Sequence, residues 1–316
     1  LVNIASLKSA PVNILFDKLQ PVKLAPINIE FVKSTTGSKT RLDGMKIVVD
    51  CANGATYKSA PQVFWELGAQ VIPVGVSPNG RNINLGCGSI DTALAAKAVL
   101  KHEADIGLCL DGDGDRLTVI DEKGKVASGD QLLAVLANNW LVNGRLSKKI
   151  IVSTIMSNIG FERYLGDLGI ELLRTAVGDK YVVQKMRDEG CNLGGEQSGH
   201  IVATDFATTG DGLIASLQIC SALADCQCAA SELLNVYTPV PQKTVNAKYR
   251  KNNDPLENNK ILAEIKKAES KISPAGRLVV RKSGTEPLLR IMGEHENEDL
   301  LNEVLLHLAG TVSENY

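Results

Sequence analysis

The sequence has 316 residues, of which 44% are hydrophobic and 22% are charged, and its formal net charge is −2. This length is sufficient for two or three domains that each bury a core. The near-neutral charge and the lack of a basic block exclude the usual signatures of nucleic-acid and anionic-membrane partners. The sequence also contains no apolar run of about 18 residues, the length that a membrane-spanning helix needs.

The first 40 residues carry no clear structural pattern. Three prolines interrupt residues 1–29, and the short apolar clusters between them follow no sustained period. Residues 30–34 are consistent with the end of a helix, but a segment of this size is too small for a domain. Because the chain starts with Leu1 rather than Met, we expect residues 1–40 to be the unassigned remnant of a longer N-terminal part.

Between residues 41 and 145, predicted strands and helices alternate. Short β-branched runs predict the strands, and periodic apolar residues predict the helices. The alternation predicts an α/β domain with helices packed on a mainly parallel sheet. The predicted strands are 46–50, 70–74, 106–110 and 117–121, and the predicted helices are 56–67 and 91–102.

The same alternation restarts after Gly144 and predicts a second α/β domain at 146–239. Asp179 is expected to be the N-cap of a helix that follows a short Gly-containing turn. The predicted strands are 149–154 and 170–175, and the predicted helices are 159–168, 180–189, 211–224 and 229–236.

Pro239 and Pro241 mark the next boundary, and a smaller α+β domain is predicted at 240–316. Its predicted strands are 243–249, 277–281 and 288–292, and its predicted helices are 256–270 and 298–309. The predicted fold class is therefore α/β, with two α/β mixed-sheet domains plus the smaller C-terminal α+β domain.

The seven cysteines of the chain are an odd number and form no C-x-x-C pair. Cys226 and Cys228 lie in an Ala-rich stretch with a helical pattern. We therefore expect neither a disulfide framework nor a structural zinc site. A cytoplasmic location is expected, because thiols persist in a reducing compartment and the N-terminus lacks the charged-then-apolar order of a signal peptide.

The most informative stretch is Asp111-Gly-Asp-Gly-Asp115, which follows the apolar run 106–110 and precedes Arg116. Three carboxylates at every second position can converge on one point, and the two glycines permit the bend. Like charges this close repel unless a cation lies between them. Hard oxygen ligands suit Mg²⁺, and Arg116 adds a positive group that suits phosphate. The pattern predicts a metal site that receives a phosphorylated ligand.

Two other interpretations apply to the same stretch. Asp and Gly are turn residues, so it could be a solvated hairpin between the strands 106–110 and 117–121. The aspartates and Glu122 also occupy the carboxylate positions of an EF-hand loop. That alternative fails, because Arg116 stands where an EF-hand needs glycine and the flanking residues favour strands.

Two further loops carry polar groups. Residues 194–200 form a Gly-rich loop with the side chains Glu196, Gln197, Ser198 and His200. Residues 281–287, followed by Arg290, combine cations, hydroxyls and a glycine, a composition that is typical of a phosphate-binding nest. The alternative for the second loop is a polar hairpin turn.

These three loops resemble those of the α-D-phosphohexomutases, which carry a DGDGDR metal loop, a GE-x-SGH sugar loop and an R-x-SGTEP phosphate loop in this order. The resemblance extends from about Glu30 to the C-terminus and includes the stretches 50–54, 82–89 and 208–212. Gln197 and the form of the last loop are similar to the bacterial phosphoglucosamine mutases, while phosphomannomutase/phosphoglucomutase specificity is the alternative.

The resemblance implies an intramolecular phosphotransferase that interconverts glucosamine 6-phosphate and glucosamine 1-phosphate, for the synthesis of UDP-N-acetylglucosamine and peptidoglycan. It implies Mg²⁺ as cofactor, a sugar 1,6-bisphosphate as intermediate or activator, a phosphosugar as ligand, and a homodimer as assembly. Asp111, Asp113 and Asp115 would bind the metal. The implied substrate-binding residues are Arg116, Lys180, Glu196, Ser198, His200, Arg281, Ser283, Gly284, Thr285 and Arg290.

Two residues of this set have their own qualifications. His200 follows a glycine and could simply cap a strand. Lys180 stands where relatives often have arginine, which would weaken phosphate binding because lysine lacks the bidentate fork.

The sequence departs from the family in one respect. The phosphoserine loop of the family, of the form Thr-x-Ser-His-Asn-Pro, does not occur in it. We therefore assign no catalytic residue and expect a truncated mutase that is inactive alone. A non-catalytic phosphosugar- and Mg²⁺-binding remnant is the second hypothesis, and a phosphatase with a loop aspartate as nucleophile is the third.

Overall fold

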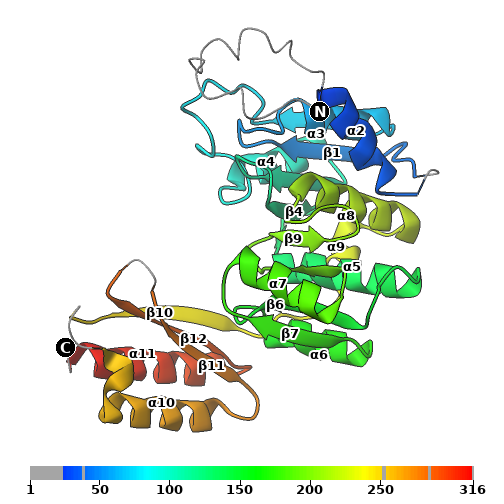
Figure 1. Ribbon diagram of the computed structural model, residues 1–316. Helices are drawn as coiled ribbons and strands as arrows, with labels where there is room; N and C mark the ends of the chain where they lie inside the picture. The colour runs from blue at the N-terminus through cyan, green and yellow to red at the C-terminus, as the bar shows by residue number, and fades with distance from the viewer. Residues whose placement is uncertain (1–23, 38–39, 251–253, 284–285, 315–316) are drawn as a thin grey trace, which may run out of the picture.

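The computed structural model describes residues 24–37, 40–250, 254–283 and 286–314. Figure 1 shows three bodies in series, with the N-terminal body at the top, a second body below it and the C-terminal body to one side. Two of them are built on sheets that mix parallel and antiparallel strands, and the third on an antiparallel sheet.

The N-terminal body contains a sheet of order β2-β1-β3-β4-β5. Its first three strands pair in parallel, whereas β4 and β5 are antiparallel additions at one side. The elements in chain order are α2 (Leu24–Ser34), β1 (Lys46–Asp50), α3 (Ser59–Glu66), β2 (Gln70–Val74), α4 (Ala93–His102), β3 (Ile106–Leu110), β4 (Leu117–Asp121) and β5 (Val126–Ala127).

Alternation along the strands supplies both faces of this sheet with apolar side chains. Val48 points to the face that α4 covers, where it packs with Ala95 and Val99. Its neighbours Ile47 and Val49 point to the opposite face and join the main core of the molecule. A strand that is buried on both faces reads as a continuous apolar run, which is why β1 and β3 were predicted correctly.

The second body contains a sheet of order β7-β6-β8-β9, in which β8 and β9 form an antiparallel hairpin. Its elements are α5 (Gly129–Val142), β6 (Ile150–Thr154), α6 (Ile159–Asp167), β7 (Glu171–Thr175), α7 (Asp179–Glu189), β8 (Leu193–Gly195), β9 (Ile201–Ala203), α8 (Gly212–Cys226) and α9 (Ala230–Leu233).

Helix α8 connects the first two bodies. It lies against α5, but it also contacts β3 and β4 of the first sheet and helix α2, and Figure 1 shows it below the N-terminal body. Leu213, Leu217 and Cys220 of α8 belong to the same continuous core as Leu108 and Leu117 of the first sheet. The two bodies therefore share one hydrophobic core.

The C-terminal body has its own core. Strands β10 (Gln242–Lys248), β12 (Leu288–Glu294) and β11 (Arg277–Lys282) form an antiparallel sheet of that order. The 3-10 helix η2 (Pro255–Glu257) and helices α10 (Asn259–Ile272) and α11 (Glu298–Glu314) complete the body. Figure 1 shows both α-helices on one face of the sheet, and their apolar residues pack around Leu289 and Ile291.

The predicted fold class is confirmed, with mixed sheets in the first two bodies and a smaller α+β body at the C-terminus. The structure corrects the prediction that Asp179 is an N-cap, because Gly178 occupies that position and Asp179 is the first helical residue. Helix α5 was not predicted, although Ser128 and Gln131 form a capping box, a sequence signature of a helix N-terminus.

Cys226 and Cys228 form a disulfide at the C-terminal end of α8, and the other five cysteines are free and buried. A single short-range pair is not a framework, but the sequence did not predict it. In the described part of the chain, no helix is long and apolar enough to cross a membrane.

Candidate functional site

The metal loop connects β3 to β4, which pair in antiparallel fashion, so the stretch 111–116 does close a hairpin. Its three aspartates nevertheless converge, because carboxylate oxygens of Asp111, Asp113 and Asp115 lie within 4.8 Å of one another. Asp111 is buried, and its Oδ1 accepts hydrogen bonds from the backbone N–H groups of Gly114 and Arg116 at 3.1 Å each. The loop therefore folds around the Asp111 carboxylate.

The electrostatics of this loop suit a divalent cation. Burial and, next, the nearby Asp115 carboxyl raise the pKa of Asp111. Nε of Arg116 lies 3.9 Å from both Asp111 Oδ2 and Asp115 Oδ1, and this buried nitrogen has no hydrogen-bond partner among the described residues. The three carboxylates carry more negative charge than the single guanidinium group of Arg116 can neutralise. A hard cation such as Mg²⁺ fits these oxygen ligands.

His200 contacts the metal loop rather than standing alone. The side chain is 3% exposed, its Nε2 accepts a hydrogen bond from Gly210 N–H at 3.1 Å, and its Nδ1 lies 3.2 Å from Asp115 Oδ2. Since Nε2 is the acceptor, the neutral ring carries its hydrogen on Nδ1, facing Asp115. His200 directly precedes β9 and faces the Asp115 carboxylate, and its role as a substrate-binding residue stays a prediction.

The sugar loop is the connection between β8 and β9. Glu196, Gln197 and Ser198 line a cavity of about 240 Å³ together with Thr154, Met156 and Val177. Glu196 is held in place because its Oε1 accepts from Gly178 N–H at 2.9 Å and its Oε2 accepts from the Ser198 hydroxyl at 3.3 Å. A carboxylate beside a hydroxyl in a small cavity can accept and donate hydrogen bonds to a polyol.

Backbone contacts join the sugar loop to the metal loop. Leu117 N–H, just after the metal loop, donates to Gly199 O at 3.0 Å. Gly199 has a φ of +91°, and a Cβ at this position would lie 2.0 Å from Leu117 O. Only glycine permits both the backbone conformation and the approach. The two loops are thus parts of one site.

Lys180 lies at the start of α7, two residues after Gly178. Its side chain is exposed, and Nζ lies 4.8 Å from the centre of the Tyr181 ring. The contact with Glu196 in this region comes from the Gly178 backbone and not from Lys180. The role of Lys180 as a ligand-binding residue stays a prediction.

In the C-terminal body, Arg281 and Arg290 lie in paired strands and directly face each other across β11 and β12. Burial and the neighbouring Arg290 lower the pKa of Arg281. The Ser283 hydroxyl and Arg290 Nε are buried without a hydrogen-bond partner among the described residues. Two facing guanidinium groups and unsatisfied donors are chemically suited to an anion such as phosphate, and the binding role of these residues stays a prediction. Gly284 and Thr285 lie outside the described residues.

Several residues that support the metal loop were not identified as functional from the sequence. Gly54 approaches so closely that a Cβ there would lie 2.2 Å from Gly112 O, and the next residue, Ala55, donates to that oxygen at 2.8 Å. Gly212 N–H donates to Gly114 O at 2.8 Å. The buried Asp50 carboxylate accepts from Ala52 N–H and Gly88 N–H. The sequence signal for these contacts was the family resemblance of three stretches, 50–54, 82–89 and 208–212. All three meet at the metal loop.

Comparison with known proteins gives a consistent family assignment. Residues 28–124 match the phosphoglucomutase/phosphomannomutase alpha/beta/alpha domain II, residues 128–240 match domain III, and residues 244–310 match the C-terminal domain of that family. The chain belongs to the phosphoglucomutase/phosphomannomutase family.

Among curated proteins, the chain is 56% identical over 284 residues to the phosphoglucosamine mutase of Paracoccus denitrificans, covering 90% of this chain and 64% of the relative. It is 54% identical over 277 residues to that of Roseobacter denitrificans, covering 88% and 62%. The chain therefore spans a little under two thirds of the length of these relatives.

Solved structures of the family share the fold. A phosphoglucomutase/phosphomannomutase family protein from Burkholderia thailandensis superimposes with a TM-score of 0.73 at 22% identity, covering 90% of this chain and 64% of its own. The Aspergillus fumigatus N-acetylphosphoglucosamine mutase, solved in complex with GlcNAc-6P and magnesium, gives a TM-score of 0.68 at 20% identity and covers 90% and 68%.

Proposed function

We propose that this chain provides the Mg²⁺ site, the sugar loop and the phosphate site of a phosphoglucosamine mutase, which interconverts glucosamine 6-phosphate and glucosamine 1-phosphate. The observation that carries the proposal is the convergence of Asp111, Asp113 and Asp115 beside a loop that places Glu196 and Ser198 in a cavity. The high identity to named phosphoglucosamine mutases supports the amino-sugar substrate over a hexose without nitrogen.

Each site would have a separate task. A bound Mg²⁺ supplies positive charge that stabilises the phosphoryl group during transfer. Glu196 and Ser198 would hydrogen-bond sugar hydroxyls, and Arg281 and Arg290 would hold the phosphate that does not react. Holding one phosphate fixes the position of the other, and such positioning contributes to the rate of phosphoryl transfer. A sugar 1,6-bisphosphate would be the intermediate that changes orientation between the two transfers.

Calorimetric titration tests the proposal. Mg²⁺ should bind to the chain, and glucosamine 6-phosphate should bind more tightly when Mg²⁺ is present. Asp113→Asn removes one exposed ligand without changing the shape of the side chain, and we expect Mg²⁺ affinity to fall at least about tenfold, the effect of losing one strong ligand. Asp167→Asn, an exposed carboxylate at the end of α6, is the control with the same change in charge.

Activity measurements separate the alternative functions. Turnover requires a phosphoryl carrier, so mutase activity is to be measured in a polypeptide extended to the length of the relatives. Binding without turnover in that longer protein would favour a binding remnant. Release of inorganic phosphate from a sugar bisphosphate by the present chain would favour a phosphatase. If the phosphosugar fails to bind in the presence of Mg²⁺, the proposed function is wrong.

A further inference from the structure

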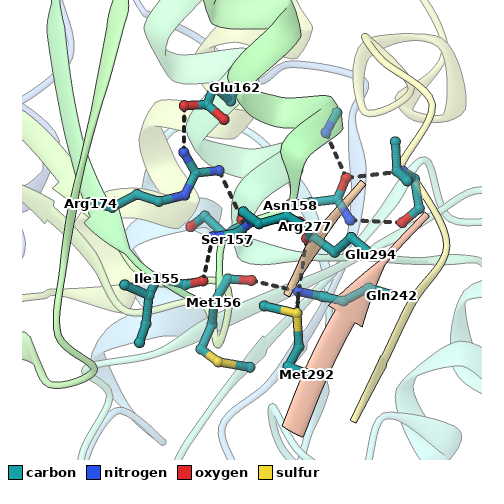
Figure 2. A network of polar contacts seen from close by, with 12 residues as sticks. Ile155, Met156, Ser157, Asn158, Glu162, Arg174, Gln242, Arg277, Met292 and Glu294 are labelled. Carbon is teal, nitrogen blue, oxygen red and sulfur yellow. Dashed lines mark hydrogen bonds and ion pairs between the residues drawn. The ribbon is translucent and has the colours of Figure 1, made fainter. Parts of the chain in front are cut away.

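Three consecutive backbone carbonyls of the second body are held by side chains from the C-terminal body. Arg277 donates from Nη1 to Ile155 O at 2.9 Å and from Nη2 to Ser157 O at 2.8 Å. Gln242 donates from Nε2 to Met156 O at 2.8 Å, between the other two. Figure 2 shows both side chains reaching this segment from the strands of the C-terminal sheet.

The segment they hold forms part of the candidate sugar site. Residues 155–157 connect β6 to α6, and Met156 lines the same cavity as Glu196 and Ser198. A wall of the cavity is therefore held by the C-terminal body in addition to its own body, in which Arg174 Nη2 donates to Ser157 O at 3.2 Å. Backbone carbonyls at the end of a strand have no ladder partner here, so the side-chain donors satisfy them.

A buried carboxylate fixes the two donors to each other. Glu294 is 0% exposed and accepts from Arg277 Nε at 2.9 Å and from Gln242 Nε2 at 3.1 Å. Both partners are directly opposite Glu294 in the sheet, one on β10 and one on β11. A buried charge that is paired on both sides strongly restricts the rotamers around it.

The chain of contacts extends to the sugar loop. Gln197 donates from Nε2 to Gln242 Oε1 at 2.9 Å and to Asp130 Oδ2 at 3.2 Å. The amide of Gln242 thus uses its oxygen to hold the sugar loop and its nitrogen to hold the β6–α6 segment. Two sides of one cavity meet at this single side chain.

The facing arginines lie farther along the same face of the C-terminal sheet. Arg277 and Arg281 are four residues apart on β11, and Glu294 and Arg290 are four apart on β12, so all four point to one face. At about 3.3 Å per residue, the arginine pair lies roughly 13 Å along the strands from the row that holds the cavity. The sheet therefore acts as a rigid spacer between a sugar cavity and an anion site.

We propose that Gln242 and Arg277 are positioning residues that set the distance between the sugar cavity and the Arg281–Arg290 pair, so that one phosphosugar engages both. The proposal rests on the proposed function, because it needs a ligand with a sugar and a phosphate. Neither Gln242 nor Arg277 lines the sugar cavity, so both act through the segments that they hold.

The test uses Gln242→Leu, which keeps the size of the side chain but removes its hydrogen bonds. In the presence of Mg²⁺, we expect the affinity for glucosamine 6-phosphate to fall about tenfold, as the loss of two or three buried hydrogen bonds implies. Mg²⁺ affinity should stay at the wild-type value. Arg277→Lys, which retains the charge beside Glu294 but not the fork, should weaken phosphosugar binding in the same direction.

Lys243→Ala is the matched control. Lys243 is the next residue on β10, but it pairs with Glu298 and Asn302 inside the C-terminal body. Its removal should leave phosphosugar affinity unchanged. Wild-type affinity in Gln242→Leu would overturn the proposal, and so would a loss of binding that is explained by unfolding of the C-terminal body at the temperature of the titration.

Hydrogen exchange separates this proposal from the proposed function. Val240 N–H donates to the Asn158 side chain and Asn158 N–H donates to Asp130, both next to the held segment. In Gln242→Leu without ligand, peptides covering these amides should exchange faster than in wild type, because the contact between the bodies loosens. If wild type binds no phosphosugar, the proposed function fails, and unchanged exchange in the variant would then overturn the positioning role as well.

Discussion

Among single residues outside the metal loop, Asp130 combines full burial with an unsatisfied carboxylate oxygen. Its side chain is 0% exposed at the start of α5, and burial raises its pKa to about 6. Asn158 N–H and the Gln197 amide both donate to Oδ2, whereas Oδ1 is buried without a hydrogen-bond partner among the described residues. The folded state therefore favours the protonated carboxyl more than the unfolded state does.

This difference makes stability depend on pH. Below about pH 4 both states are protonated, and between pH 4 and about 6 the folded state binds more protons than the unfolded state. The contribution of Asp130 is therefore fully present at low pH and is lost as pH rises through 6. Asp130→Asn should remove this component, which amounts to about 1–3 kcal/mol, so that the variant loses less stability than wild type between pH 4.5 and about 7.

Urea titrations at several pH values check this expectation as the difference between variant and wild type. Asp43→Asn is the sign control, because hydrogen bonding to Arg41 lowers the pKa of this exposed carboxyl. Its removal should not flatten the profile in the same window. An identical pH dependence in Asp130→Asn and wild type would contradict the assignment.

At the scale of elements, the candidate site depends on loops that pack against loops. The metal loop rests on the turn after β1, where Gly54 leaves no room for a Cβ beside Gly112. Gly54→Ala should displace the metal loop and weaken Mg²⁺ binding at least about tenfold, because a clash with backbone cannot be relieved by a rotamer change. Gly166→Ala in α6, where the added Cβ would meet nothing within 4 Å, is the control.

Calorimetric titration with Mg²⁺ measures the effect of both glycine substitutions. Gly166→Ala should also raise stability slightly, since alanine favours a helix over glycine. Retention of full Mg²⁺ affinity in Gly54→Ala would show that the loop tolerates displacement.

The elements also show what the sequence could and could not reveal. Strands β1 and β3 were predictable because β3 has no polar side chain and β1 has three consecutive β-branched residues between Lys46 and Asp50. The Asp-Gly alternation at 111–115 likewise predicted converging carboxylates. Hairpin β8–β9 was not predicted, because each of its strands is only three residues long and two of the three residues of β8 are glycines. The contacts of Gln242 and Arg277 were not predictable either, because polar residues on a strand look the same whether they face solvent or another body.

Across the whole molecule, hydrophobic burial divides the chain into two units rather than three. The first two bodies share a core that runs through α8, whereas the C-terminal body has a separate one. The contacts between the two units near Gln242 and Arg277 are polar. Polar interfaces couple unfolding less strongly than a continuous apolar core does.

Calorimetric unfolding should therefore show two transitions. Leu217→Ala in α8 should lower the midpoint of the unit that contains the first two bodies, and Ile291→Ala in β12 should lower that of the C-terminal body. Each substitution should destabilise its own unit by about 2–5 kcal/mol and leave the other midpoint nearly unchanged. A single transition that both variants shift equally would contradict this division.

The position of α8 has a consequence for the order in which the protein forms during synthesis. The sheet that carries the metal loop ends at Ala127, but the helix that covers part of one face begins at Gly212. At about 5–20 residues per second, this face remains open on the ribosome for several seconds until α8 emerges. During that time the nascent chain exposes apolar surface that a chaperone can bind. Docking of α8 and formation of the metal loop would then coincide, because Gly212 at the start of α8 donates to Gly114 O.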